Sequence, residues 1–275
     1  MPKGRKLESI ADYQRALKNK YGLGQGSKYK PWLRVQDVKS RGTRSQIFGR
    51  KTNREHHLMS LLESELFYLI EFSDRVTDIR EQFPILPLNY SQKVAKTLGV
   101  EHPKHPKTKE PIVLTTDLLL TVDSESGQYF HAISVKPEEE AGVDRVLQKV
   151  EIERICWELM GVKFSFYVGD DLRRIQSENI AWATFPFRKG PSYFSFELVT
   201  SALSLLKKKQ YYKEDLCEKF IKNNIVNRDE SLLLLKYLIS EKFIEVDLNY
   251  SLGESDVIDI RNIAFEQRRF AYENF

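Results

Sequence analysis

Two neighbouring stretches with the composition of β-strands constrain the fold of this chain most strongly. Residues 114–120 (LTTDLLL) and 129–137 (YFHAISVKP) are rich in leucine, β-branched and aromatic residues, and a polar turn sequence at 123–127 separates them. This pattern predicts a hairpin or two adjacent strands. Asp117 lies inside the first stretch, and Lys136 lies at the end of the second.

A carboxylate or an ammonium group buried alone in a sheet is costly unless it is paired or binds a metal. The pattern therefore leaves two interpretations. In a metal-dependent phosphodiesterase, Asp117 would hold a divalent cation, and Lys136 would stabilise the attacked phosphate or its nucleophile. In the other interpretation, the two stretches form a partly exposed edge hairpin whose charged ends are solvated.

The chain has 275 residues, enough for one large domain or two ordinary ones, and its hydrophobic content of 41% suffices for a packed core. The net charge of +4 says little by itself, but cations cluster between residues 28 and 54 with Asp37 as the single acid. Such clustering is typical of a contact with the DNA backbone, although a solvated basic loop is an equal alternative. The predicted DNA-binding residues are Lys28, Lys30, Arg34, Lys39, Arg41, Arg44, Arg50, Lys51 and Arg54.

The two cysteines, Cys156 and Cys217, lie far apart in helical patterns and have no zinc-binding spacing. We interpret both as small core residues of a protein in a reducing cytoplasm. No secretory signal and no apolar run of membrane-spanning length are visible, so we expect a cytoplasmic protein with no membrane contact.

The hydrophobic spacing predicts a helix over residues 8–21 and another from His56 and His57 to about residue 72. A strand over 76–83, a surface loop over 89–110, a helix over about 137–161 and a strand over 163–168 follow. Together with the central hairpin, these elements predict a three-layer α/β core. Glu63 lies in the second helix, either as a solvated residue or at the edge of the apolar stripe, where its carboxylate could reach a metal.

The predicted secondary structure changes to short helices towards the C-terminus. A helix over 172–182 leads out of the first domain, and residues 185–192 (FPFRKGPS) are expected to form a linker. Three short helices over 196–208, 212–223 and 229–241 and a strand over 243–248 are the pattern of a winged helix. Its third helix has few cations, so both DNA reading and protein docking remain open.

Several motifs together resemble the TnsA family, the endonuclease subunits of heteromeric cut-and-paste transposases. The resemblance covers most of the first 170 residues. The motifs that carry it are Lys30-Pro31-Trp32-Leu33 with Val35-Gln36-Asp37-Val38, His56-His57-Leu58, Asp78-Ile79-Arg80-Glu81-Gln82-Phe83-Pro84, Thr116-Asp117 and Val135-Lys136-Pro137.

The resemblance implies a restriction-endonuclease-like catalytic domain over residues 1–171, with a mixed sheet flanked by helices and a basic N-terminal arm. A mostly α-helical, winged-helix-like domain would follow over 172–275. It also implies a Mg²⁺-dependent endonuclease of the bacterial cytoplasm, with Mn²⁺ as a substitute, that cleaves the 5′ ends of a transposon. The implied partners are the transposon-end DNA, a DDE-type transposase subunit that cleaves the 3′ ends, and an ATP-dependent regulator protein.

Carried over to this chain, the resemblance implies that Glu63, Asp117 and Lys136 are catalytic. Glu63 and Asp117 would bind the metal together with the backbone carbonyl of Val135. Glu153 is an additional candidate acid. Ser134 is a further candidate, because it stands where the wider nuclease superfamily has Asp or Glu two residues before the Lys.

Two other functions remain open. The chain could be a non-catalytic adaptor that binds DNA or docks partners in a transposition complex, but such an adaptor would need none of the three catalytic candidates. A stand-alone restriction enzyme fits the predicted fold but not the basic arm.

Overall fold

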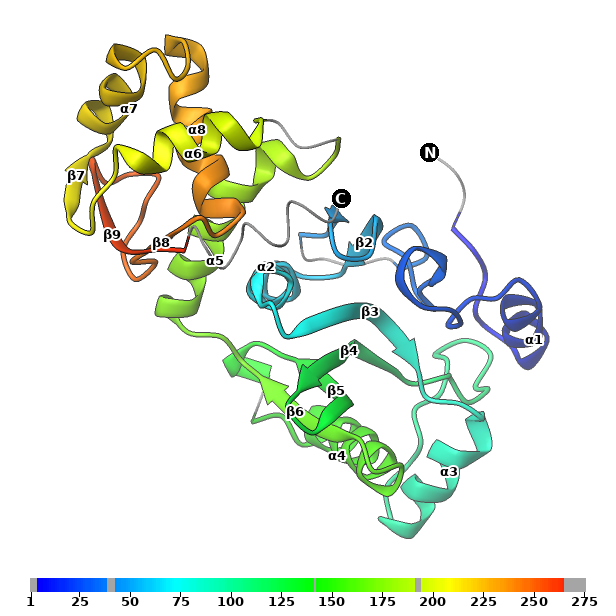
Figure 1. Cartoon of the computed structure of the whole chain (residues 1–275). Coiled ribbons are helices and arrows are strands. Elements are labelled where there is room, and N and C mark those ends of the chain that lie inside the picture. Colours follow the sequence, from blue (N-terminus) through cyan, green and yellow to red (C-terminus); the bar gives the residue numbers. More distant parts are fainter. Residues whose placement is uncertain (1–3, 39–42, 141, 191–193, 265–275) are drawn as a thin grey trace. The chain divides into compact units, whose positions relative to one another are not determined.

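The computed structural model describes residues 4–38, 43–140, 142–190 and 194–264. The chain divides into two compact units, Met1–Gly169 and Asp170–Phe275 (Figure 1). The first unit holds all the candidate catalytic residues, and the second holds the predicted short helices.

The first unit is built on a four-stranded sheet in the order β3-β4-β5-β6. Adjacent strands are antiparallel except for β5 and β6, which are parallel. The mixed sheet and its flanking helices confirm the predicted α/β class. The elements are α1 (Ile10–Lys18), η1 (Gly26–Lys28), β1 (Ser45–Gly49), β2 (Arg54–Leu58), α2 (Leu61–Phe72), β3 (Val76–Pro84), α3 (Leu88–Thr97), β4 (Thr115–Ser124), β5 (Gly127–Val135), η2 (Glu138–Glu140), α4 (Asp144–Leu159) and β6 (Lys163–Tyr167).

Helices cover both faces of this sheet (Figure 1). Successive side chains of a strand point to opposite faces, and β4 shows this directly. Leu118 and Leu120 pack in one core with Phe67 of α2, and the β1–β2 hairpin contributes to the same core. Leu119 packs in the other core with Ile152 of α4 and residues of α3. The unit therefore has three layers, as the sequence predicts.

The start of α2 differs from the sequence prediction. His56 and His57 do not open this helix but lie in β2, which pairs with β1. The helix begins after Ser60, whose hydroxyl accepts a hydrogen bond from the backbone N–H of Glu63 (3.1 Å). A serine followed three residues later by a glutamate is the sequence signature of such an N-terminus.

The predicted surface loop over residues 89–110 is also wrong in part, because α3 occupies its first half. His102 is buried rather than exposed, and its Nε2 lies 3.0 Å from the hydroxyl of Ser91. The helix predicted over 137–161 is in fact a short 3-10 turn, η2, followed by α4.

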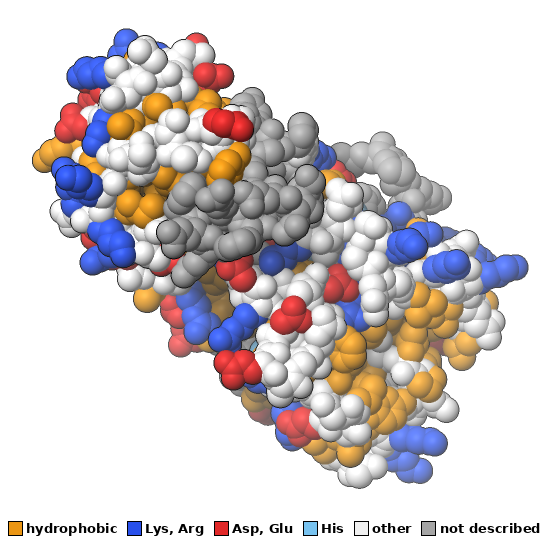
Figure 2. Space-filling view, viewed as in Figure 1, with side chains coloured by type: hydrophobic (Ala, Val, Ile, Leu, Met, Phe, Trp, Pro, Cys, Tyr) orange, Lys and Arg blue, Asp and Glu red, His pale blue; other side chains and the backbone are white. Residues whose placement is uncertain are grey.

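On the face of the molecule shown in Figure 2, Lys and Arg side chains lie among Asp and Glu side chains, in keeping with the small net charge. Cys156 is buried and Cys217 is half-buried, and both are free thiols. None of the helices in the described part of the chain is both long and apolar enough to span a membrane.

The second unit consists of helices packed on a small antiparallel sheet in the order β7-β9-β8. The sequence prediction missed β7 and β9. The elements are α5 (Asp171–Thr184), η3 (Phe185–Phe187), α6 (Phe196–Ser204), β7 (Gln210–Tyr212), α7 (Lys213–Lys222), α8 (Arg228–Ser240), β8 (Ile244–Val246) and β9 (Val257–Ile263).

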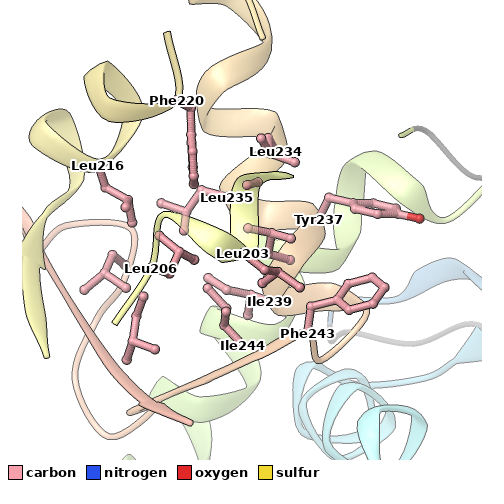
Figure 3. Packing of buried hydrophobic residues seen from close by; sticks show 14 of the residues in the cluster. Leu203, Leu206, Leu216, Phe220, Leu234, Leu235, Tyr237, Ile239, Phe243 and Ile244 are labelled. Carbon is pink, nitrogen blue, oxygen red and sulfur yellow. The ribbon is translucent and has the colours of Figure 1, made fainter. Parts of the chain in front are cut away.

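The core of this unit is drawn in Figure 3, where Leu216 and Phe220 of α7 lie near Leu234 and Leu235 of α8. The residues expected to form a linker contribute to this core. Phe187 is buried, and its ring packs edge-on against the ring of Tyr237 at 5.2 Å between centroids. The described part of the predicted linker is therefore part of the folded unit.

Candidate active site

The centre of the site is a contact between Asp117 of β4 and the end of β5. Oδ2 of Asp117 accepts hydrogen bonds from the backbone N–H of Val135 (2.7 Å) and from Nζ of Lys136 (3.0 Å). Nζ of Lys136 also donates to the carbonyl oxygen of Val135 (2.7 Å). Burial acts to lower the pKa of Lys136, but the Asp117 carboxylate outweighs it and raises the pKa, so the ammonium stays charged.

Glu63 reaches this centre from the first turn of α2. Its side chain is almost completely buried, and it accepts hydrogen bonds from the backbone N–H of Met59 (3.0 Å) and from the hydroxyl of Ser60 (3.2 Å). Burial, and then the charge of Asp117, raise the pKa of Glu63 to about 8. A second positive charge near these acids would favour their ionised forms.

Gln82 of β3 connects the two acids and was missed by the sequence prediction. Its Nε2 lies 3.4 Å from Oε2 of Glu63 and 3.3 Å from Oδ1 of Asp117. Its Oε1 accepts a hydrogen bond from the hydroxyl of Thr115 (3.1 Å). Its position depends on the strand register, which the sequence does not show: Glu81 pairs with Leu118 and Phe83 pairs with Thr116, which leaves Gln82 opposite Asp117.

Glu153 and Ser134 complete the group of predicted residues that the structure brings together. Glu153 is buried on α4, and burial, followed by the charge of Asp117, raises its pKa to about 8. The hydroxyls of Thr116 and Ser134 and the Lys136 charge act in the opposite direction. Within the described residues, Oε1 of Glu153 and Oγ of Ser134 have no hydrogen-bond partner of good geometry.

The oxygens at this site fit a hard divalent cation. Two carboxylates, from Glu63 and Asp117, and the carbonyl oxygen of Val135 are the kind of ligand that Mg²⁺ prefers, with water filling the other positions. No group of three or more His, Cys, Asp and Glu side chains in the described residues is placed to hold a metal. The Val135 carbonyl would add a third protein oxygen beside the two carboxylates. In this structure the Lys136 ammonium and the Gln82 amide supply the positive charge that faces the acids.

The predicted DNA-binding cations lie in different environments. Lys28, Lys30, Arg44, Arg50 and Lys51 are exposed, whereas Lys39 and Arg41 lie outside the described residues. Arg34 is half-buried, and its Nε forms an ion pair with Asp37 (3.2 Å).

Arg54 is the one described cation of this set that is buried, because it belongs to an internal ion-pair network. Its Nη2 and Nη1 donate to the carboxylate of Glu81 at 2.6 and 2.8 Å. Nδ1 of the fully buried His56 lies 2.8 Å from Oε2 of the same carboxylate. Burial alone would raise the pKa of Glu81, but the charges and hydrogen bonds of His56 and Arg54 hold it well below its usual range.

The chain is similar to known proteins over the region that holds most of this site. Residues 73–169 match the family model described as TnsA-like endonuclease N terminal, a range that contains Gln82, Asp117, Lys136 and Glu153. Over 183 residues the chain is 36% identical to the transposon Tn7 transposition protein TnsA of Escherichia coli. This alignment covers 66% of the chain and 65% of the relative, so it spans slightly less than two thirds of the relative's length.

Proposed function

Because the chain belongs to the TnsA family, we propose that it is the endonuclease subunit of a heteromeric transposase and cleaves the 5′ ends of a transposon with Mg²⁺. The observation that carries this proposal is the convergence of Glu63 from α2, Asp117 from β4 and Lys136 from directly after β5. Neither an edge hairpin nor a DNA-binding adaptor needs a buried glutamate and a half-buried aspartate beside a lysine. The non-catalytic adaptor remains the alternative function.

The residues would divide the work as follows. Glu63, Asp117 and the Val135 carbonyl would hold Mg²⁺ or Mn²⁺, which supplies Lewis-acid stabilisation and an activated water when bound. Lys136 would place its ammonium against the charge that develops on the scissile phosphate. Glu153 and Ser134 have unused oxygen atoms near this centre, so they are the candidates for holding a second cation or its waters.

The second unit supports a winged-helix-like domain. Its order of helix α6, strand β7, helices α7 and α8 and hairpin β8–β9, with β9 central in the sheet, is the arrangement expected of that fold. Helix α8 would be the recognition helix, but Leu234, Leu235 and Leu238 are completely buried in it. Lys236 lies over the ring of Trp182 in the same unit at 4.4 Å. These features favour protein docking, by the DDE-type subunit or an ATP-dependent regulator, over base reading.

DNA contact is proposed for the exposed cations of the arm and not for Arg54. An exposed ammonium or guanidinium can neutralise a phosphate, and this supplies much of the affinity of a protein for DNA. Arg54 is committed to Glu81 and is buried. The proposed arm is therefore Lys28, Lys30, Arg44, Arg50 and Lys51, together with Lys39 and Arg41 of the undescribed segment.

The test is to map which DNA strands are cleaved on a mini-transposon, in the presence of the DDE-type subunit and the regulator encoded beside this chain. In the wild type we expect nicks at the 5′ ends that require the chain and a divalent cation. Lys136→Ala should lose these nicks but keep 3′ joining, so that products shift from simple insertions to cointegrates. Lys96→Ala, an exposed lysine of α3, is the matched control and should behave as the wild type.

The same assay separates nuclease from adaptor. An adaptor would give 5′ nicks that are unchanged by Asp117→Ala or Lys136→Ala. If Lys136→Ala lost both products, gel filtration of the assembled complex would show whether assembly had failed. An intact complex without 3′ joining would contradict the proposed division of strands.

A further inference from the structure

Gln82 has an unusual backbone as well as an unusual position. Its φ is +48°, in the left-handed region that side chains other than glycine and asparagine seldom adopt. The residue lies inside β3, where an extended backbone is the norm. Strain of this kind is found at functional sites, where the surrounding structure enforces it.

The surroundings of Gln82 do enforce this conformation. Its side chain is only 3% exposed, and its backbone carbonyl accepts a hydrogen bond from the N–H of Trp32 (3.2 Å). The preceding residue, Glu81, is fixed by the buried Arg54. The result is that the amide of Gln82 points at Glu63 and Asp117, the two acids that the proposed function assigns to the cation.

We propose that Gln82 is itself a residue of the cation site. In the structure its NH₂ group lies between the two carboxylates, and a bound divalent cation would instead take its carbonyl oxygen once the amide had turned. This inference rests on the proposed function, because it deepens the assignment of the same site.

The hydroxyl of the neighbouring Thr115 can form a hydrogen bond with the Gln82 amide in either orientation of that amide. In the structure the Thr115 hydroxyl donates to Oε1, while Nε2 faces the acids. A hydroxyl can donate or accept equally well, so Nε2 could donate to Thr115 after the amide turns. Without a cation, an oxygen turned towards Oδ1 of Asp117 and Oε2 of Glu63 would be repelled by their lone pairs, whereas with a cation present the oxygen becomes a favourable hard ligand.

Two substitutions of Gln82 should shift cation affinity in opposite directions. Gln82→Asn keeps an amide and suits the left-handed backbone, but it is one methylene shorter and cannot reach both acids. We expect Mn²⁺ binding to weaken about tenfold, in the range seen when groups around a metal site are lost. Gln82→Glu adds a third carboxylate, and we expect Mn²⁺ binding to tighten about tenfold, because affinity rises with ligand charge.

The measurement is calorimetric titration of Mn²⁺ alone into the full chain, followed by thermal unfolding with and without Mn²⁺. Without cation, Gln82→Glu should melt below the wild type because three carboxylates then face one another, and Mn²⁺ should restore it. Gln92→Asn and Gln92→Glu, at a half-buried position of α3, are the matched controls and should leave affinity within about twofold of the wild type.

Opposite shifts in the two Gln82 variants support the inference, because loss of a merely structural residue would weaken binding in both. Any other pattern of Mn²⁺ affinities overturns the inference. If Gln82→Asn failed to fold, the direction in which Gln82→Glu shifts Mn²⁺ affinity would decide alone. Asp117→Asn separates this result from the proposed function. If the wild type binds Mn²⁺ and Asp117→Asn does not, while Gln82→Glu is unchanged, only the role of Gln82 fails. If the wild type itself binds no Mn²⁺, the metal-dependent function fails as well.

Discussion

Replacing Glu81 by glutamine should strongly destabilise the first unit. The Glu81 side chain is completely buried, and the Arg54 side chain that it pairs with is only 8% exposed. The substitution keeps the shape of the side chain but removes its charge. The Arg54 guanidinium then remains buried without a counter-ion, which is the situation in which loss of one partner of a buried pair costs about 3–5 kcal/mol.

For a unit of this size, each kcal/mol corresponds to a shift of about 2–4 °C in melting temperature, so Glu81→Gln should lower it by about 6–20 °C. Trp32 and Trp157 lie in the first unit and Trp182 in the second, so a Trp182→Phe background restricts fluorescence to the first unit. Urea unfolding of this background would give the free energy directly. Glu125→Gln, at the exposed turn between β4 and β5, is the control and should change stability by less than about 0.5 kcal/mol.

A double substitution tests the physical reason. If the cost comes from an unpaired buried charge, Arg54→Met combined with Glu81→Met should cost less than the sum of the single changes, because no buried charge is left behind. A Glu81→Gln protein as stable as the Glu125→Gln control would refute the buried ion pair. Arg54 would then rejoin the cations proposed to contact DNA.

Three further outcomes are expected. Lys28→Ala with Lys30→Ala should weaken DNA association and reduce the slope of log affinity against log salt by about two units, measured by fluorescence anisotropy, whereas Lys96→Ala should leave the slope unchanged. Leu235→Ala should destabilise the second unit by about 2–5 kcal/mol in unfolding followed by Trp182 fluorescence, whereas Leu232→Ala, 42% exposed, should be nearly neutral. Burial, and then the charge of Lys163, lower the pKa of His131 to about 4, so the folded state disfavours the protonated ring and stability falls as the pH drops from 6.5 towards 4. His131→Gln should flatten this part of the stability profile, and an unchanged profile would contradict the assigned pKa.

The central strands could be predicted because their information is local. Residues around Asp117 alternate between two cores, and the turn residues at 123–127 mark the hairpin without reference to the rest of the chain. The closeness of Asp117 in β4 to Lys136, the residue after β5, follows from this pairing. The sequence predicts the position of Glu63 beside Asp117 only as one of two alternatives, because hydrophobic periodicity does not show where a residue at the edge of the apolar stripe of a helix points.

The wrong start of α2 has a specific physical cause. Leu58, Leu62 and Leu66 have the four-residue spacing of one helical face, and this favoured a helix from His56 onwards. In the structure Leu58 enters the same core as Leu66 but from strand β2, so the spacing is satisfied by two different elements. The Ser60 cap was the local signal that distinguished them.

Gln82 could not be found from the sequence because its role depends on contacts distant along the chain. Its place opposite Asp117 needs the register of β3 with β4, and the hydrogen bond that its left-handed backbone receives comes from Trp32, 50 residues earlier in the chain. The partners of Arg54 were hidden for the same reason. In a sequence, a buried arginine within a basic stretch looks the same as an exposed one.

The buried network and the strained glutamine are connected, and this connection gives the opening prediction a second consequence. A left-handed non-glycine residue costs about 1–3 kcal/mol and persists only where neighbours over-determine it. Glu81 is one such neighbour, since Arg54 and the backbone N–H of His57 hold its carboxylate, and the hydroxyl of Tyr29 donates to its carbonyl.

Glu81→Gln should therefore loosen Gln82 and weaken Mn²⁺ binding without touching any oxygen of the cation site. Gln82→Asn should weaken Mn²⁺ binding to a similar degree but leave stability close to that of the wild type, because asparagine tolerates the left-handed backbone. Glu81→Gln should thus lose both Mn²⁺ affinity and stability, whereas Gln82→Asn should lose only Mn²⁺ affinity. Measuring both quantities in both variants distinguishes the residues that hold the amide in place from the amide itself.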